Sequence, residues 1–185
     1  MNSIPEYPGN LCKGMIMDAM QAVLTRRSIR KYRQGEVSEE MVLQLLQAAM
    51  NAPSAGNEQP WHFMVIRERR ILDAIPTIHP YANMLKEAAL AILVCGDATL
   101  EVYKGFWVQD CSAATQNILI AAHALGLGAV WLGFHPIEQR IASLKQMLSI
   151  PEYIMPLSMV SIGWPAEEKT PVLRYRQERV HYNKW

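Results

Sequence analysis

Residues 52–61 read Ala-Pro-Ser-Ala-Gly-Asn-Glu-Gln-Pro-Trp, and they mark the place where a helical pattern changes to a strand pattern. Before them, apolar residues recur at helical spacing over residues 38–50, with Ser38 as a suitable N-cap. Pro53 ends that helix. After them, the run from Trp61 to Ile66 predicts a strand. The quoted segment is therefore a loop between a helix and a strand.

The composition of this loop suits two roles. Its small residues allow the backbone to approach a flat ligand closely, and Ser54, Asn57 and Gln59 offer hydrogen-bonding groups at fixed positions. The same residue types are typical of tight connections that bind nothing. The loop alone therefore does not indicate a function.

The rest of the chain predicts helices mixed with strands, which favours helices packed on a central sheet. Gly126 is the expected cap of the longest helix. Residues 165–185 form a polar, extended tail. The expected helices span residues 17–25, 68–75, 106–125 and 137–148, and the expected strands span residues 89–95, 129–132 and 157–162.

Cations are concentrated in two places. Residues 26–33, Arg-Arg-Ser-Ile-Arg-Lys-Tyr-Arg, hold five of them, and the tail adds Arg174, Arg176 and Arg179. An arginine presents a planar set of donors that matches a phosphate group, and Ser28 adds a hydroxyl. A solvated basic turn has the same composition, so both interpretations stay open at this stage.

Residues 126–133, Gly-Leu-Gly-Ala-Val-Trp-Leu-Gly, do not form a dinucleotide-binding fingerprint. The spacing is not GxGxxG, and the segment follows a helix, whereas the fingerprint opens one. Gly133 ends an expected buried strand, where a glycine often exposes its N–H to a ligand.

Length and composition narrow the classes of protein. The 185 residues fit one domain, and the net charge of +1 gives no support for nucleic-acid binding. No apolar run is long enough to cross a membrane. The cysteines, Cys12, Cys95 and Cys111, include no CxxC pair, which argues against disulfides and zinc and favours a reducing cytoplasm. Residues 1–16 are expected to be a flexible leader.

The order of these segments, RRSIRKY, APSAGNEQPW, GLGAVWLGF and a basic tail ending in RVHYNKW, resembles the short, single-domain members of the nitroreductase family. The resemblance covers residues 17–185 and implies one FMN-binding domain. It implies an α+β fold with a central, mainly antiparallel sheet flanked by helices. It further implies a homodimer with FMN at the subunit interface and a C-terminal segment that embraces the partner. Trp164 and Trp185 are expected to be buried by that partner.

The resemblance also assigns cofactor-binding residues, position by position. The first arginine motif would hold the FMN phosphate, the ribityl chain and the pyrimidine edge, and it falls on Arg26, Arg27, Ser28 and Arg30. The loop that the other subunit contributes falls on Pro53, Ser54, Ala55 and Asn57, with Gln59 beside it. The backbone at Leu132 and Gly133 would face N5 and O4 of the flavin. Arg174 would complete the phosphate site, with Arg176 as a second candidate.

The resemblance implies an enzyme that passes reducing equivalents from NADH or NADPH to nitroaromatic, quinone or similar flat acceptors by a ping-pong mechanism. The chemistry would lie at FMN N5, so no catalytic side chain and no metal is expected. Other activities on the same fold stay open, namely reductive dehalogenation, azoline oxidation and flavin fragmentation. A non-catalytic flavin-binding redox module and an interaction protein without FMN are further alternatives.

Overall fold

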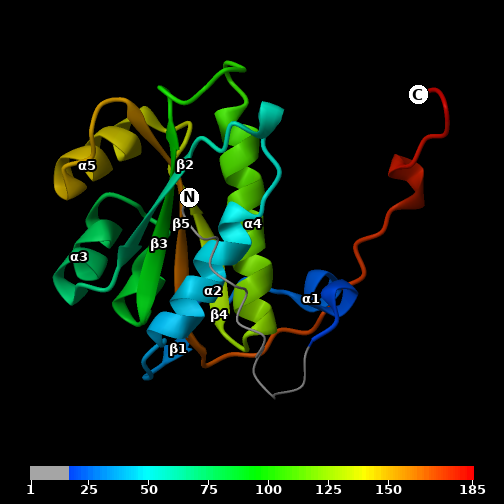
Figure 1. Ribbon diagram of the computed structural model, residues 1–185. Coiled ribbons are helices and arrows are strands. Elements are labelled where there is room, and N and C mark those ends of the chain that lie inside the picture. The colour runs from blue at the N-terminus through cyan, green and yellow to red at the C-terminus, as the bar shows by residue number, and fades with distance from the viewer. Residues whose placement is uncertain (1–16) are drawn as a thin grey trace, which may run out of the picture.

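The computed structural model describes residues 17–185, so the expected leader at residues 1–16 lies outside the described residues. One five-stranded sheet forms the centre of this part (Figure 1). The strand β5 (Ile154–Pro165) pairs with three others: β3 (Leu90–Asp97), β4 (Gly128–Gly133) and β1 (Tyr32–Arg33). The strand β2 (Trp61–Ile66) pairs with β3. All of these ladders are antiparallel, so the expected α+β fold is confirmed.

Helices cover both faces of the sheet (Figure 1). The helices α2 (Glu39–Met50) and α4 (Trp107–Ala124) pack on one face, and α3 (Arg69–Ala74) and α5 (Glu138–Leu148) lie on the other. Each face has its own apolar core, in which side chains are removed from water. The remaining helix α1 (Ala19–Thr25) lies near the end of α4. Short 3-10 helices occupy Ala55–Asn57, Ile75–Thr77, Asn83–Lys86 and Gln177–Arg179.

The predicted caps are present. Oγ of Ser38 accepts a hydrogen bond of 3.2 Å from the N–H of Met41 at the start of α2. Gly126 follows Leu125, the last cap residue of α4, and its φ of 74° is the left-handed conformation that glycine adopts without strain. The N–H of Leu127 reaches the carbonyl of Ala122 at 2.8 Å, which completes a Schellman motif.

The structure differs from the predicted elements in three places. The strand β1 was not predicted, and the predicted helix over residues 68–75 ends one residue earlier, where a 3-10 turn takes over. The strand β5 is longer at both ends than the predicted residues 157–162. It contains Pro156, which pairs with Cys95 next to a register shift in the ladder with β3, a position where a strand tolerates proline.

The tail leaves the body of the molecule (Figure 1). It carries exposed apolar side chains. Leu173 is 85% exposed and Trp185 is fully exposed. Trp164, which was expected to be buried by a partner, is half-buried within its own chain. Its indole N–H donates a 3.0 Å hydrogen bond to the carbonyl of Glu36 in the same chain, and the guanidinium of Arg33 lies 5.5 Å from the ring centroid. In residues 17–185, no helix combines the length and apolar character that a membrane crossing requires.

Candidate functional site

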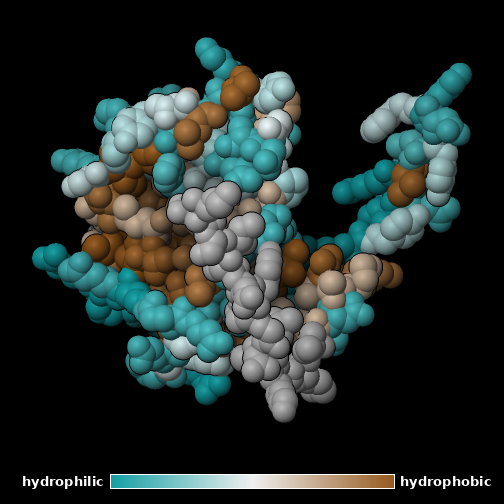
Figure 2. Space-filling view, viewed as in Figure 1, coloured by the Kyte–Doolittle hydropathy of each residue, from teal (hydrophilic) through white to brown (hydrophobic). Residues whose placement is uncertain are grey.

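Three of the predicted arginines meet at one hollow. Arg26 and Arg27 follow α1, and Arg174 approaches them from the tail, 147 residues later in the sequence. Together with apolar residues of α1 and the tail they line a hollow of about 450 Å³. Figure 2 shows apolar surface in the region where α1 meets the start of the tail. Two segments that are distant in the sequence therefore form one positively charged, partly apolar hollow.

The electrostatics of this hollow favour an anion. The pKa of Arg26 is lowered, first by burial and then by the positive charges of Arg174 and Arg27. Within residues 17–185, no carboxylate forms an ion pair with any of these three side chains. Like charges that are gathered and partly desolvated repel one another, and a bound phosphate group relieves that repulsion.

The neighbouring predicted residues have identifiable partners. The guanidinium of Arg27 donates to the carbonyls of Thr170 at 3.1 Å and Val172 at 3.3 Å, so it anchors the start of the tail. The carbonyl of Ser28 accepts a 2.8 Å hydrogen bond from Nζ of Lys169. Arg176 is exposed and does not line the hollow.

A second hollow, of about 340 Å³, lies along β4. The N–H of Ile29 donates to the carbonyl of Ala129 at 3.0 Å, which holds Arg30 beside this strand. Gly133 ends the strand, and an added Cβ there would meet no atom within 4 Å. Gly133 is therefore open toward a space that protein atoms do not fill. The lining residues come from four segments: Arg30, His79, Tyr81, Val130, Trp131, Leu132, Gly133, His135, Ile137 and Arg140.

Two donors converge on the carbonyl of Gly133. Nε2 of His79 donates at 3.0 Å, and Nη1 of Arg140 donates at 3.4 Å. Nδ1 of His79 accepts the N–H of Tyr81 at 3.3 Å, so both ring nitrogens are occupied and the imidazole is neutral. Burial lowers the pKa of His79. The hydrogen bond to Gly133 acts in the opposite direction, and the positive charge of Arg140 lowers the pKa further. Sequence analysis did not identify these three lining residues, His79, Tyr81 and Arg140.

The predicted loop has a fixed internal structure. Oγ of Ser54 accepts the N–H of Gln59 at 3.0 Å, and the amide of Gln59 donates to Oδ1 of Asn57 at 3.0 Å. Asn57 and Gln59 both have positive φ, 58° and 48°. Pro53, Asn57 and Gln59 are exposed, whereas Ser54 and Ala55 are half-buried.

Within one chain, this loop is far from the arginine hollow. The loop is joined to the start of α4, because the N–H of Ala55 donates to Asp110. The arginine hollow adjoins the end of α4, where Thr25 Oγ1 and His123 Nε2 are 2.8 Å apart. Asp110 and His123 are thirteen residues apart on one helix, so these two ends are about 20 Å apart. In Figure 1 the loop is at the upper end of α4, and α1 is beside the lower end.

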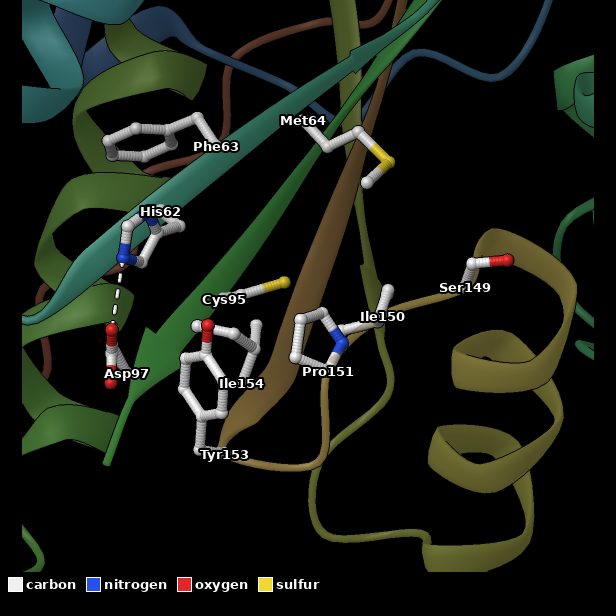
Figure 3. A pocket seen from close by; sticks show the side chains of 10 residues that line it. All are labelled: His62, Phe63, Met64, Cys95, Asp97, Ser149, Ile150, Pro151, Tyr153 and Ile154. Atoms are coloured by element: carbon white, nitrogen blue, oxygen red, sulfur yellow. Dashed lines mark hydrogen bonds and ion pairs between the residues drawn. The ribbon is translucent and has the colours of Figure 1, made fainter. Parts of the chain in front are cut away.

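A further hollow, of about 360 Å³, lies near the start of β2 and the end of β3 (Figure 3). Nε2 of His62 is 3.2 Å from Oδ2 of Asp97, and the other oxygen of Asp97 accepts from the N–H and hydroxyl of Thr99. Figure 3 shows the sulfur of Cys95 directed away from His62 and Ser149 on the opposite side. Among the described residues, no hydrogen bond joins His62 to either group, so the pair lacks a nucleophile. None of the predicted site residues lines this hollow.

Residues 17–185 hold no group of three or more His, Cys, Asp or Glu side chains that could bind a metal ion. The described residues instead provide two arginine-lined hollows, one between α1 and the tail and one along β4 of the antiparallel sheet.

Comparisons with known proteins agree with this description. The model of the nitroreductase family matches residues 23–164. A protein of Methanothermobacter thermautotrophicus named "Putative NADH dehydrogenase/NAD(P)H nitroreductase" is 52% identical over 169 residues, which cover 91% of this chain and 88% of the relative. A crystal structure of a protein with the same name, from Parabacteroides distasonis, is 40% identical with a TM-score of 0.87, and covers 90% of this chain and 98% of its own.

A crystal structure from Desulfovibrio desulfuricans, described as "a putative nitroreductase in complex with fmn", is 33% identical with a TM-score of 0.78. The match covers 90% of this chain and 97% of that one. The chain therefore belongs to the nitroreductase family, and the prediction of the family is confirmed.

Proposed function

We propose that residues 17–185 form one FMN-binding domain of an NAD(P)H-dependent flavin oxidoreductase. In this proposal the enzyme passes reducing equivalents from NADH or NADPH to nitroaromatic, quinone or similar flat acceptors. The family membership supports the enzyme class, and the relatives' names and the FMN complex of the Desulfovibrio protein support the cofactor.

The observation that carries the proposal is the short separation along the chain between an arginine of the first hollow and an arginine of the second. Arg26 lines one hollow and Arg30 lines the other, and a four-residue separation spans at most about 14 Å. A ligand with a phosphate at one end and a flat ring at the other fits this pair. We assign the phosphate to Arg26 and Arg174, and the ring to the hollow along β4, beside Leu132 and Gly133.

Two features of the second hollow fit a flat, electron-accepting ring. The space in front of Gly133 is one that a side chain would occupy at any other residue type. Nδ1 of His135, another lining residue, is buried and has no hydrogen-bond partner among residues 17–185. An unpartnered buried nitrogen is costly, and a bound ligand is one means of satisfying it.

The residues of the chain would then bind and orient, while bound FMN supplies the hydride and electron chemistry. Arg26 and Arg174 hold the phosphate charge. Arg30 lies where the resemblance assigns the pyrimidine edge, so its charge would favour the reduced cofactor. Because the cofactor would carry out the chemistry, the reaction needs no side-chain nucleophile in either hollow.

We propose that a second copy of the chain completes the site. The loop residues Pro53, Ser54, Ala55 and Asn57, with Gln59, lie about 20 Å from the arginine hollow of their own chain. A twofold arrangement would place them at the hollow of the partner. The exposed apolar side chains of α1, Met20, Val23 and Leu24, and those of the tail support an extensive interface.

The proposed kinetic mechanism is ping-pong, with the nicotinamide and the acceptor using one site in turn. The second hollow is small, at about 340 Å³. The sequence of residues 17–185 contains no GxGxxG fingerprint for a separate nucleotide site. The proposed location is the cytoplasm, with which the free thiols of Cys95 and Cys111 agree.

The purified protein tests the proposal directly. It should be yellow, and denaturation should release one FMN per chain. In a stopped-flow instrument NADH or NADPH should bleach the flavin absorbance, and a nitroaromatic or quinone should restore it. A flavin that is bound but not reduced by either nucleotide would indicate a non-catalytic module, and a colourless protein that takes up no FMN would contradict the proposal altogether.

A further inference from the structure

The hollow along β4 contains a second cation to which neither the motifs nor the resemblance assigned a role. Arg140 is the third residue of α5, and it lines the same hollow as Arg30. A positive side chain in the first turn of a helix lies near the positive end of the helix dipole, which is unfavourable. Its position there calls for a compensating interaction.

The structure offers Arg140 little compensation from the protein itself. No carboxylate of residues 17–185 forms an ion pair with it, although it is half-buried. Within the described part of the chain its guanidinium donates one hydrogen bond, to the carbonyl of Gly133, which is long at 3.4 Å. An arginine has five N–H donors, so most of its donors are uncommitted.

The other residues of the lining add no negative charge to the hollow. His79 already donates to the same Gly133 carbonyl at the shorter distance of 3.0 Å. His79 is neutral, so the positive charge of the lining comes from Arg30 and Arg140. No aspartate or glutamate is among the described residues that line this hollow. The hollow is therefore suited to a ligand that carries or gains negative charge.

We infer that Arg140 is a further cofactor-contacting residue, which binds the flavin ring and favours its reduced form. This inference rests on the proposed function. Hydride transfer from NAD(P)H breaks the nicotinamide C–H bond and delivers two electrons and one proton, so the ring gains one negative charge. A guanidinium held beside the ring is attracted more strongly after that transfer than before it.

The test is the midpoint potential of the FMN-loaded protein, measured by equilibration with a reference dye. Arg140→Gln should weaken reduced FMN relative to oxidised FMN about tenfold, which for a two-electron couple lowers the potential by about 30 mV. Arg140→Lys keeps the charge and should restore part of the difference. The control is Arg70→Gln, which removes an exposed arginine that pairs with Glu68 on the surface, and it should leave the potential unchanged.

Two results would overturn the inference. The first is an unchanged potential in Arg140→Gln together with slower turnover of carboxylated acceptors only, which would assign Arg140 to the acceptor. The second is a potential and turnover that both match the wild type. The potential of Arg140→Met is measured in parallel. If one of the two uncharged variants fails to fold, the other still provides the test. A wild-type protein without FMN would instead contradict the proposed function, so the two failures are distinguishable.

Discussion

The backbone N–H of Ala55 donates a 3.1 Å hydrogen bond to Oδ1 of Asp110, which fastens the loop after α2 to the first turn of α4. The second oxygen of Asp110 is buried and has no partner among residues 17–185. Burial raises the pKa of this carboxyl group. The Ala55 bond opposes that effect, and the charges of Glu58 and Glu101 add to it.

The first prediction concerns this raised pKa. The folded state binds the Asp110 proton more readily than the unfolded chain does. The stability gained from this proton is present below the unfolded pKa of about 3.9, and it is lost as the pH rises through the folded pKa.

Asp110→Asn keeps an acceptor for Ala55 and removes the charge. It should therefore be more stable than the wild type at pH 8, with a smaller difference at pH 4, in urea unfolding of the FMN-free protein. Asp110→Ala removes the acceptor and should be less stable than Asp110→Asn at both pH values. An Asn variant whose effect does not depend on pH would refute this account.

The second prediction concerns the phosphate site. A charge-assisted contact contributes roughly 1.5–3 kcal/mol, so Arg26→Ala should weaken FMN binding about tenfold or more without unfolding the protein. Flavin fluorescence during titration of the FMN-free protein measures this. Arg70→Ala, on the exposed side of α3, serves as the control and should bind FMN normally. If Arg26→Ala purifies with a full complement of flavin at low protein concentration, Arg26 does not bind the FMN phosphate.

The third prediction uses the open space in front of Gly133. Gly133→Ala meets no protein atom within 4 Å, and Gly133 does not have a positive φ, so the FMN-free variant should melt at the wild-type temperature. Its FMN affinity should nevertheless fall, because the methyl group occupies space assigned to the ring. Gly96→Ala shows the opposite pattern in the structure, since its Cβ would meet the Trp107 ring, and it should lower the melting temperature. Normal FMN affinity in Gly133→Ala would show that the ring does not bind in front of Gly133.

The fourth prediction concerns the assembly. The full chain should be a stable dimer at micromolar concentration, with an interface above about 2,000 Å². A chain that ends after Arg176 keeps Arg174 and the tail carbonyls that Arg27 holds, so it should fold but dissociate at higher concentrations than the full chain. Light scattering and sedimentation distinguish the two. A flavin-loaded monomer of the full chain would contradict the shared site.

The fifth prediction concerns the kinetics. If the nicotinamide and the acceptor use one site in turn, double-reciprocal plots at several acceptor concentrations should be parallel. Flat acceptors should be favoured, and selectivity among them should be loose, because stacking provides contact area with few fixed polar contacts. Intersecting lines, with direct binding of both substrates at once, would exclude the shared site and leave FMN binding untouched.

Local signals were sufficient for most of the fold. Ser38 and Gly126 cap their helices as predicted, because each cap depends on a few neighbouring residues. The strand β1 escaped prediction because its two residues, Tyr32 and Arg33, lie inside a run of cations. Their extended conformation follows from pairing with Pro165 and Trp164, which are more than 130 residues away.

The candidate site was predicted less completely than the fold. Arg26, Arg30 and the loop were assigned through the family resemblance, because the cluster of cations and the turn residues left more than one interpretation open. His79 and Arg140 were missed, because each is a single residue on its own element and only the tertiary structure brings both to Gly133. One signal was available: Arg140 is a cation in the first turn of an expected helix, where the dipole disfavours it.

The length of α4 has a consequence for mixtures of two variants. The loop and the arginine hollow lie at opposite ends of this helix, so each chain would give its loop to one site and its arginines to the other. A chain with Arg26→Ala and a chain with Asn57→Ala would each form homodimers with two damaged sites. A heterodimer of the two would concentrate both defects in one site and leave the other intact. Mixing two poorly active preparations under conditions of subunit exchange should therefore regain activity, up to half that of the wild type per heterodimer.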